Sequence, residues 1–145
     1  MDERKETNTK DWICKGKQGI VFVTKNSSII TVQVGSKVLL PCTIKNLCDG
    51  TVSWVRRKDY HLLTVGLAPY AGDDRFHSAH PFNSDDWSLQ IKFVELRDAG
   101  LYECQVTSHP PSSIFIHLRV VGWDFELLVA KVETRKIKID YIILP

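Results

Sequence analysis

The stretch DAGLYEC, residues 98–104, decides the fold of this chain when it is taken together with Cys42 and Trp54 upstream. Two cysteines that bridge facing sheets, a tryptophan that packs against the bridge and a tyrosine two residues before the second cysteine mark one type of β-sandwich. Cys42, Trp54, Tyr102 and Cys104 have that order and spacing. We therefore expect a disulfide between Cys42 and Cys104, with Trp54 and Tyr102 in the core around it.

Short runs of alternating apolar residues surround these four positions. Alternate residues of a strand point to the same face, so each run predicts a strand with one buried face. No helix longer than one turn is expected. The apolar residues expected to face the core are Val38, Leu40, Cys42, Ile44, Trp87, Leu89, Ile91, Phe93, Ile114, Ile116, Leu118 and Val120.

The interval between Trp54 and Trp87 sets the subtype of the sandwich. It has room for two extra short strands, at about residues 62–65 and 67–70, in addition to a strand at 75–79. Variable-type immunoglobulin sandwiches have these extra strands, and constant-type ones lack them. The sequence therefore predicts an all-β, immunoglobulin V-type β-sandwich made of two antiparallel sheets with Greek-key connections.

Length and composition allow one domain of ordinary size. The chain has 145 residues, of which 43% are hydrophobic, enough for one core but not for a second full domain. We expect residues 1–16, which are polar and lysine-rich, to be disordered and residues 17–121 to form the immunoglobulin-like domain. Residues 122–145 are expected to be a divergent tail without a second domain.

The cysteines indicate an oxidising compartment, because disulfides persist outside the cytosol. The charged start, residues 1–6, has no apolar segment of a signal peptide, and no stretch approaches the roughly 20 apolar residues of a spanning helix. We expect an extracellular or cell-surface domain whose anchor is not in this chain; a reduced intracellular domain is the competing interpretation. Cys14 and Cys48 could form a second bridge, remain free or pair between molecules.

Composition and spacing argue against several functions. The net charge is only +2, which does not favour nucleic acid. The aspartate pairs at 73–74 and 85–86 lie in predicted turns, whereas acid–base catalysis needs carboxylates that face each other across a cleft. His77 and His80 fall on opposite faces of a strand, and zinc-site spacings are absent. We expect no enzyme, catalytic residue, cofactor, metal or small-molecule substrate.

Four stretches carry a family resemblance: GTVSWVRRKDYHLLTVGL at 50–67, DDRF at 73–76, NSDDWSLQIKFVELRDAGLYECQV at 83–106 and LRVV at 118–121. They resemble the first immunoglobulin domain of the defective proboscis extension response (Dpr) family of arthropod neuronal cell-surface proteins. The resemblance covers roughly residues 17–121. It implies heterophilic adhesion to immunoglobulin-superfamily partners, the Dpr-interacting proteins, in neuronal and synaptic specificity. Family members also have a signal peptide, a second immunoglobulin domain and a membrane anchor.

An outward apolar patch with a polar rim indicates where such a partner would bind. Because edge strands twist, the sequence leaves open which half of the run 62–67 faces the core. A weak homodimer is a further expectation. The alternative function is a truncated or misrouted isoform with a folded domain but no partner function. The residues expected to bind a partner are Val55, Arg57, His61, Leu63, Val65, Leu67, Tyr70, Gln105, Thr107 and Phe115.

Two other features have structural or covalent roles. Arg75 and Asp98 resemble the charge pair that closes the lower end of variable-type domains, and we expect a salt bridge between them. Asn26-Ser27-Ser28 is an N-glycosylation sequon in a predicted surface turn, although sequons also occur by chance. A glycan at Asn26 is expected on an edge far from the strands that carry Val55 and Gln105.

Overall fold

The structure is a computed structural model, and it describes residues 19–108 and 110–122. The segment 1–16, with Cys14, and the tail from residue 123 onward lie outside the described residues. The predictions for these two segments, and for a bridge between Cys14 and Cys48, therefore remain predictions.

The described residues form strands and one short 3₁₀ turn, η1, at Leu96–Asp98. Most strands fall where the alternation of apolar residues predicts them. Their bounds are β1 Val21–Phe22, β2 Ser28–Gln33, β3 Val38–Leu40, β4 Ile44–Lys45, β5 Val52–Arg56, β6 His61–Val65, β7 Ala68–Pro69, β8 Phe76–Ala79, β9 Ser88–Ile91, β10 Gly100–Val106 and β11 Ser112–Val121.

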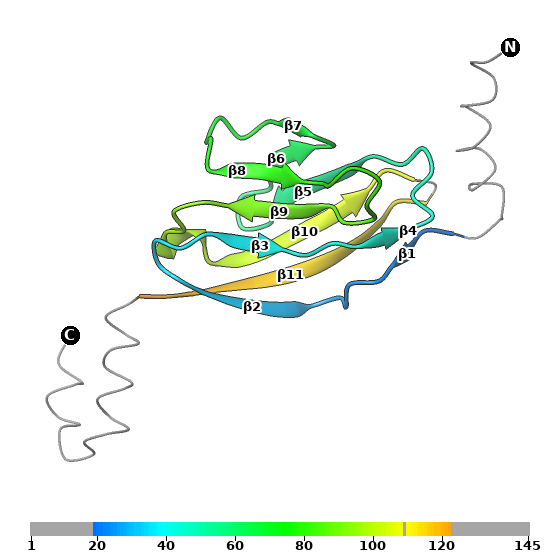
Figure 1. Cartoon of the computed structure of the whole chain (residues 1–145). Coiled ribbons are helices and arrows are strands. Elements are labelled where there is room, and N and C mark those ends of the chain that lie inside the picture. The colour runs from blue at the N-terminus through cyan, green and yellow to red at the C-terminus, as the bar shows by residue number, and fades with distance from the viewer. Residues whose placement is uncertain (1–18, 109, 123–145) are drawn as a thin grey trace, which may run out of the picture.

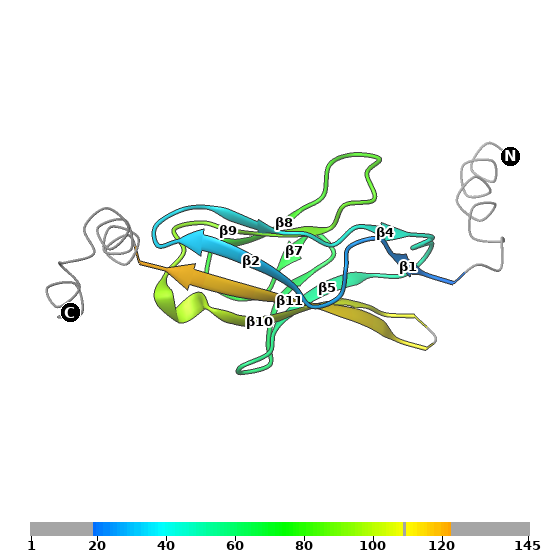
Figure 2. The same ribbon diagram turned by 90° about the horizontal axis from the view of Figure 1, so that it is seen from below.

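The strands pack as two layers (Figures 1 and 2). One layer is a sheet in the order β2-β11-β10-β5-β6-β7, and the other contains β3-β9-β8, with β1 and β4 paired beside it. The short strands β6 and β7 are the additional strands of a variable-type sandwich. The predicted all-β V-type sandwich is confirmed.

One strand pair departs from the expected antiparallel sheets. β2 runs parallel to β11, with Ile116 opposite Ser28 and Val121 opposite Gln33. The first part of this segment, β1, pairs with β4 near the other sheet, and the chain then crosses over at residues 24–27. Because it keeps its direction after crossing, it meets β11 in parallel orientation.

The core lies between the layers and contains the predicted disulfide. Cys42 and Cys104 are bonded, with 6.5 Å between their Cα atoms, and Trp54 is fully buried beside them. The indole Nε1 of Trp54 donates to the carbonyl oxygen of Trp87 at 2.9 Å, so its one polar group is satisfied. Trp54, Tyr102 and Leu89 are all buried, as expected.

Phe93 is a residue of the predicted core that the structure places outside. It is 68% exposed, because β9 ends at Ile91 and the chain turns, with Phe93 at a φ of 50°. Val94 takes the buried position instead. The alternation that begins at Trp87 therefore ends before Phe93.

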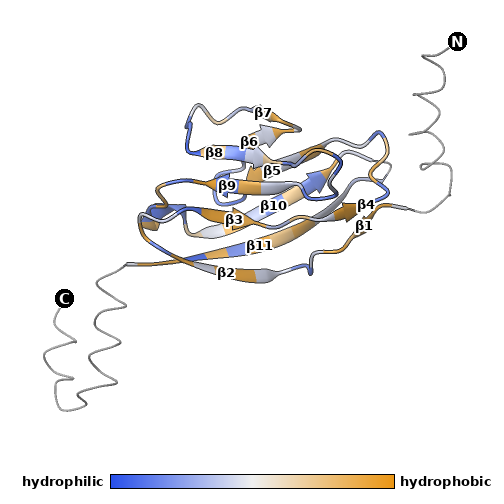
Figure 3. Cartoon of the chain, in the orientation of Figure 1, coloured by the Kyte–Doolittle hydropathy of each residue, from blue (hydrophilic) through white to orange (hydrophobic). Residues whose placement is uncertain are grey.

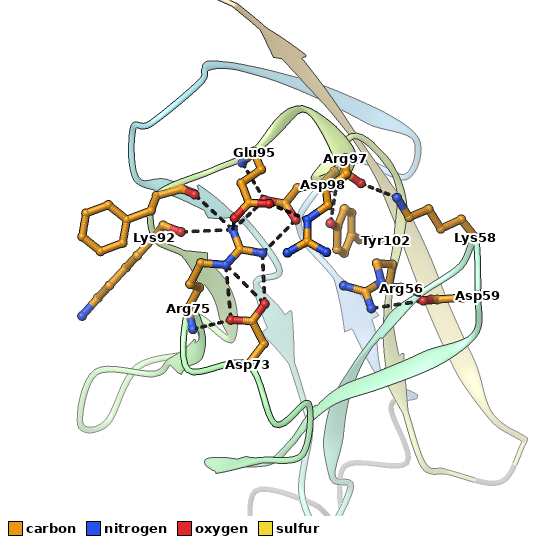
Figure 4. A network of polar contacts seen from close by, with 11 residues as sticks. Arg56, Lys58, Asp59, Asp73, Arg75, Lys92, Glu95, Arg97, Asp98 and Tyr102 are labelled. Carbon is orange, nitrogen blue, oxygen red and sulfur yellow. Dashed lines mark hydrogen bonds and ion pairs between the residues drawn. The ribbon is translucent and has the colours of Figure 1, made fainter.

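A polar network closes one end of the sandwich (Figure 4). The two terminal nitrogens of Arg75 bind the two carboxylate oxygens of Asp98 at 2.7 and 3.0 Å, so the predicted salt bridge is present. Asp98 also accepts the backbone N–H of Glu95 at 2.7 Å, and Tyr102 donates its hydroxyl proton to the carbonyl of Asp98 at 2.6 Å. These contacts join the turn η1 to β10 and to Arg75, the residue just before β8.

The network holds its charges by direct pairing. Burial alone would raise the pKa of Asp98, but the hydrogen bonds from Arg75 and Glu95 lower it below its ordinary value. The pKa of Arg75 is raised, first by its hydrogen bonds to Asp98. Burial raises the pKa of Tyr102 far above its ordinary value. The side chains of Arg75 and Asp98 are only 12% and 3% exposed. Arg75 also donates to the carboxylate of Asp73 at 3.0 and 3.2 Å, so its charge is shared between two carboxylates.

Candidate partner-binding face

The outer face of the six-stranded sheet is built from β11, β10, β5 and β6. Side chains that are directly opposite on neighbouring strands share one side of a sheet. Glu103 lies opposite both Phe115 and Val55, and Val55 lies opposite Leu62. These four side chains therefore form one row across the four strands, with apolar groups on both sides of Glu103.

Two further rows flank this central row. Gln105 is opposite Ser113 and Ser53, and Ser53 is opposite Val65, which gives a mixed row that ends on β6. On the other side, Leu101 lies opposite His117, and the backbone N–H of Arg57 donates to the carbonyl of Leu101 at 2.9 Å. The alternating hydropathy of β11 is visible in Figure 3. We call the three rows, together with Tyr60, the outer face.

A β-bulge decides which residues of β6 belong to the outer face. The register between β5 and β6 shifts between Trp54 and Val55, so Trp54 lies opposite Thr64 whereas Val55 lies opposite Leu62. Leu63 is the additional residue at this point and is 0% exposed in the core. The prediction that Leu63 lies on the binding surface is therefore wrong, because the bulge turns it inward and presents Leu62 instead.

His61 also differs from the prediction. It lies opposite Arg56, whose guanidinium group sits 5.7 Å from the ring centre of Phe76 in the other layer. Arg56 therefore points toward the inner side of the sheet, and His61 shares that side. His61 is exposed at the end of β6, outside the three rows of the outer face.

Arg57 is held in place by side chains from three segments. Its guanidinium group lies 4.8 Å from the ring centre of Tyr60 and 5.2 Å from that of Phe115. It also donates to the hydroxyl of Tyr60 at 3.1 Å and to a carboxylate oxygen of Glu103 at 3.3 Å. Arg57 thus connects β10 and β11 to the turn before β6, with a cation between two aromatic rings.

These contacts stabilise the charged form of Arg57. The pKa of Arg57 is raised, first by its hydrogen bond to Tyr60. Arginine and tyrosine are enriched among the residues that dominate binding energy at protein interfaces. Because the rotamer of Arg57 is already constrained, a partner that contacts it loses less side-chain entropy than it would with a free arginine.

The remaining predicted contact residues surround the three rows. Leu67 and Tyr70 are exposed on either side of the short strand β7. Thr107 is exposed just past β10, where its hydroxyl oxygen accepts the backbone N–H of Thr51 at 3.1 Å. Leu67 and Tyr70 are thus accessible at the β7 edge of the sheet, and their role as contacts stays a prediction. Thr107 joins the segment after β10 to the segment before β5.

Asn26 lies nearer to the outer face than expected. Its side-chain oxygen Oδ1 accepts the backbone N–H of Phe115 at 2.8 Å. Phe115 belongs to β11, and the next strand, β10, carries Gln105. One strand thus separates Asn26 from β10.

Three hydrophobic residues of the outer face are absent from the predicted contacts: Tyr60, Leu62 and Leu101. Leu62 was missed because the bulge shifts the alternation of β6 by one position. Leu101 follows from the inward position of Tyr102, since neighbours in a strand alternate. Tyr60 lies in a turn with a φ of 55°, and alternation gives no signal for a turn residue.

Among residues 19–108 and 110–122, no group of three or more His, Cys, Asp or Glu side chains is placed to hold a metal ion. No helix in the same part of the chain is long and apolar enough to cross a membrane. The outer face is the candidate partner-binding site of the described residues.

Known proteins that are similar to this chain show the family of the domain. The immunoglobulin V-set domain family matches residues 24–121. One similar solved structure is the crystal structure of Dpr1 IG1 bound to DIP-eta IG1. Its sequence identity to this chain is 39% and its TM-score is 0.67, and the match covers 70% of this chain and 96% of that chain. A second is the crystal structure of Dpr11 IG1 bound to DIP-gamma. Its sequence identity to this chain is 44% and its TM-score is 0.62, and the match covers 66% of this chain and 99% of that chain.

The curated relatives are longer proteins. Lachesin of Schistocerca americana is 32% identical over 78 residues, which is 50% of this chain and 22% of lachesin. The zwei Ig domain protein zig-8 of Caenorhabditis elegans is 23% identical over 96 residues, which is 66% of this chain and 35% of zig-8. The chain thus spans about a third or less of the length of these two relatives.

Proposed function

Because the chain belongs to the immunoglobulin V-set family and, within it, to the Dpr proteins, we propose that it is a cell-surface recognition domain. Its partner is another immunoglobulin-superfamily domain, of the Dpr-interacting protein class. The recognition unit is residues 17–121, and it acts outside the cell, where the Cys42–Cys104 disulfide is stable. It binds through a surface and catalyses no reaction.

The observation that carries this proposal is the construction of the outer face. Val55, Leu62 and Phe115 lie in one row with Glu103, and Arg57 is stacked on Phe115 beside them. Apolar and aromatic groups at the centre of a patch, with polar groups around them, are typical of protein interfaces. The Dpr domains that share 39% and 44% of their residues with this chain are each bound to a DIP domain in their crystals.

The physical basis of binding is burial of this centre against a matching sheet. An interface of standard size buries about 1,600 Å² in total, and a few central residues contribute most of the free energy. Val65 adds an apolar side chain to a flanking row on β6, and the ion pair of Arg57 with Glu103 adds directional polar groups. Function in neuronal or synaptic specificity follows from partner choice at this face.

Surface plasmon resonance with Dpr-interacting protein ectodomains tests the proposal. Val65→Glu places an unpaired charge in a row that flanks the central row of the outer face, and it should reduce affinity at least about tenfold, because burying the charge there carries a large desolvation cost. The matched control is Leu39→Glu, since Leu39 is apolar, 51% exposed and on β3 of the other sheet. Equal loss of binding in both variants would contradict the assignment of the face.

The same binding experiment distinguishes the proposed function from the alternative one. A truncated or misrouted isoform without partner function predicts no binding of the folded wild-type domain to any ectodomain of this class. Sedimentation of the wild-type domain by itself measures the weak homodimer. If that homodimer uses the outer face, Val65→Glu should weaken it and Leu39→Glu should not.

A further inference from the structure

Asn26 lies outside the three rows of the outer face, and it is the first residue of a glycosylation sequon. We propose that Asn26 bears an N-linked glycan that protects the free edge of β2 from pairing with other chains. Asn26-Ser27-Ser28 is the one Asn-x-Ser/Thr triplet in the sequence, and residue 27 is not proline. Asn26 is exposed, so the attachment point is accessible in the folded domain.

The structure orients the amide of Asn26. Its Oδ1 accepts the N–H of Phe115, and the backbone N–H of Ser27 donates to the carbonyl of Phe115 at 2.7 Å. The side chain of Asn26 thus continues the ladder between β2 and β11 by one further hydrogen bond. Within the described residues, the other end of the amide, Nδ2, makes no hydrogen bond to the protein, and Nδ2 is the atom that a glycan uses.

The modification leaves this arrangement intact. The donor is a lipid-linked oligosaccharide diphosphate of the secretory pathway. A bond forms between Nδ2 and the first sugar carbon, the bond from that carbon to the lipid diphosphate breaks, and Nδ2 gives up one proton. No oxidation or reduction takes place. Oδ1 keeps its lone pairs, so it still accepts the N–H of Phe115 and holds the first sugar beside β11.

The strand that follows needs protection. β2, with the sequence SIITVQ, is the edge of the six-stranded sheet, and among the described strands it pairs with β11 alone (Figure 1). The segment has no charge, proline or glycine, and Ile29 is 61% exposed. Short uncharged segments of high β-propensity on a sheet edge are typical sites of unwanted strand pairing.

A glycan at Asn26 is suited to prevent strand pairing at the edge of β2. Edge strands usually carry a charge, a proline or a bulge that prevents pairing, and β2 contains no charged residue or proline. Asn26 lies two residues before the start of β2, so a bulky hydrated glycan there obstructs a strand that approaches the edge. This role depends on secretion and not on which partner binds the outer face.

The test begins with the attachment. The full chain is directed into the secretory pathway of insect cells behind an added signal peptide, and its mass is measured before and after treatment with peptide N-glycosidase. Wild type and Ser28→Thr should lose the mass of one glycan. Asn26→Asp should carry none, while its carboxylate can still accept the N–H of Phe115. A wild-type chain that carries no glycan, or an unchanged mass loss in Asn26→Asp, would overturn the proposal.

The monomer fraction tests whether the glycan prevents strand pairing. Enzymatic removal converts Asn26 to aspartate and so preserves the contact with Phe115. Light scattering after size exclusion should then show loss of monomer for the deglycosylated chain and not for the glycosylated one. Ile29→Lys should restore the monomer by charging the edge, whereas Leu39→Lys on the other sheet should not. An unchanged monomer fraction after deglycosylation would refute the proposal that the glycan prevents strand pairing.

Discussion

Leu63 and Val65 are two residues apart on β6, and replacing each by alanine should have opposite consequences. Simple alternation would place both on the same face of the strand. The bulge opposite Trp54 and Val55 separates them: Leu63 is 0% exposed, and Val65 lies in a row of the outer face. Leu63→Ala therefore tests the core, and Val65→Ala tests the binding surface.

The size of the effect follows from burial. A fully buried leucine replaced by alanine costs about 2–5 kcal/mol, because the apolar contacts are lost and a cavity remains. For a domain of this size each kcal/mol lowers the melting temperature by about 4–8 °C, so a 3 kcal/mol loss for Leu63→Ala corresponds to roughly 12–24 °C. Val65→Ala removes methyl groups from a partly exposed site and should cost about 1 kcal/mol or less.

Two measurements decide the matter. Guanidinium unfolding with the disulfide intact should show a lower midpoint for Leu63→Ala and an almost unchanged midpoint for Val65→Ala, with similar slopes. Partner affinity at low temperature, where both variants remain folded, should fall for Val65→Ala and stay near wild type for Leu63→Ala. If Val65→Ala destabilises the domain as much as Leu63→Ala, the bulge and the placement of the outer face are wrong.

The polar network at the end of the sandwich gives two more predictions. Asp98→Asn should lower the free energy of unfolding by about 1.5–3 kcal/mol, because the charged hydrogen bonds of the buried carboxylate are weakened while Arg75 keeps its ion pair with Asp73. Lys45→Ala, which breaks the exposed pair with Asp85, should cost about 1 kcal/mol or less by the same denaturation assay, and similar losses would contradict this account. The folded-state pKa of Asp98 lies below its ordinary value of 3.8, so its contribution is present above about pH 5 and is lost as pH falls through 3.8 and lower. Unfolding midpoints between pH 6 and 3 should decline less steeply in Asp98→Asn than in wild type.

The sequence alone determined the sandwich and its central core. Cys42, Trp54, Tyr102 and Cys104 lie where variable-type domains place them, and the disulfide joins two of them. This was predictable because alternation and spacing are local properties of the chain, and an inward residue of a regular strand stays inward. The pair of Arg75 and Asp98 was predictable for a different reason, since it came from resemblance to variable-type domains.

Only the tertiary structure decided the details of the surface. Whether Leu62 or Leu63 faces outward depends on a bulge set by pairing with β5, and the exposure of Phe93 depends on where β9 ends. The contact of Asn26 with Phe115 and the stacking of Arg57 join residues that are far apart in sequence. Alternation predicts the faces of a strand, but register, bulges and contacts between strands depend on how distant segments meet, and a local pattern does not contain that information.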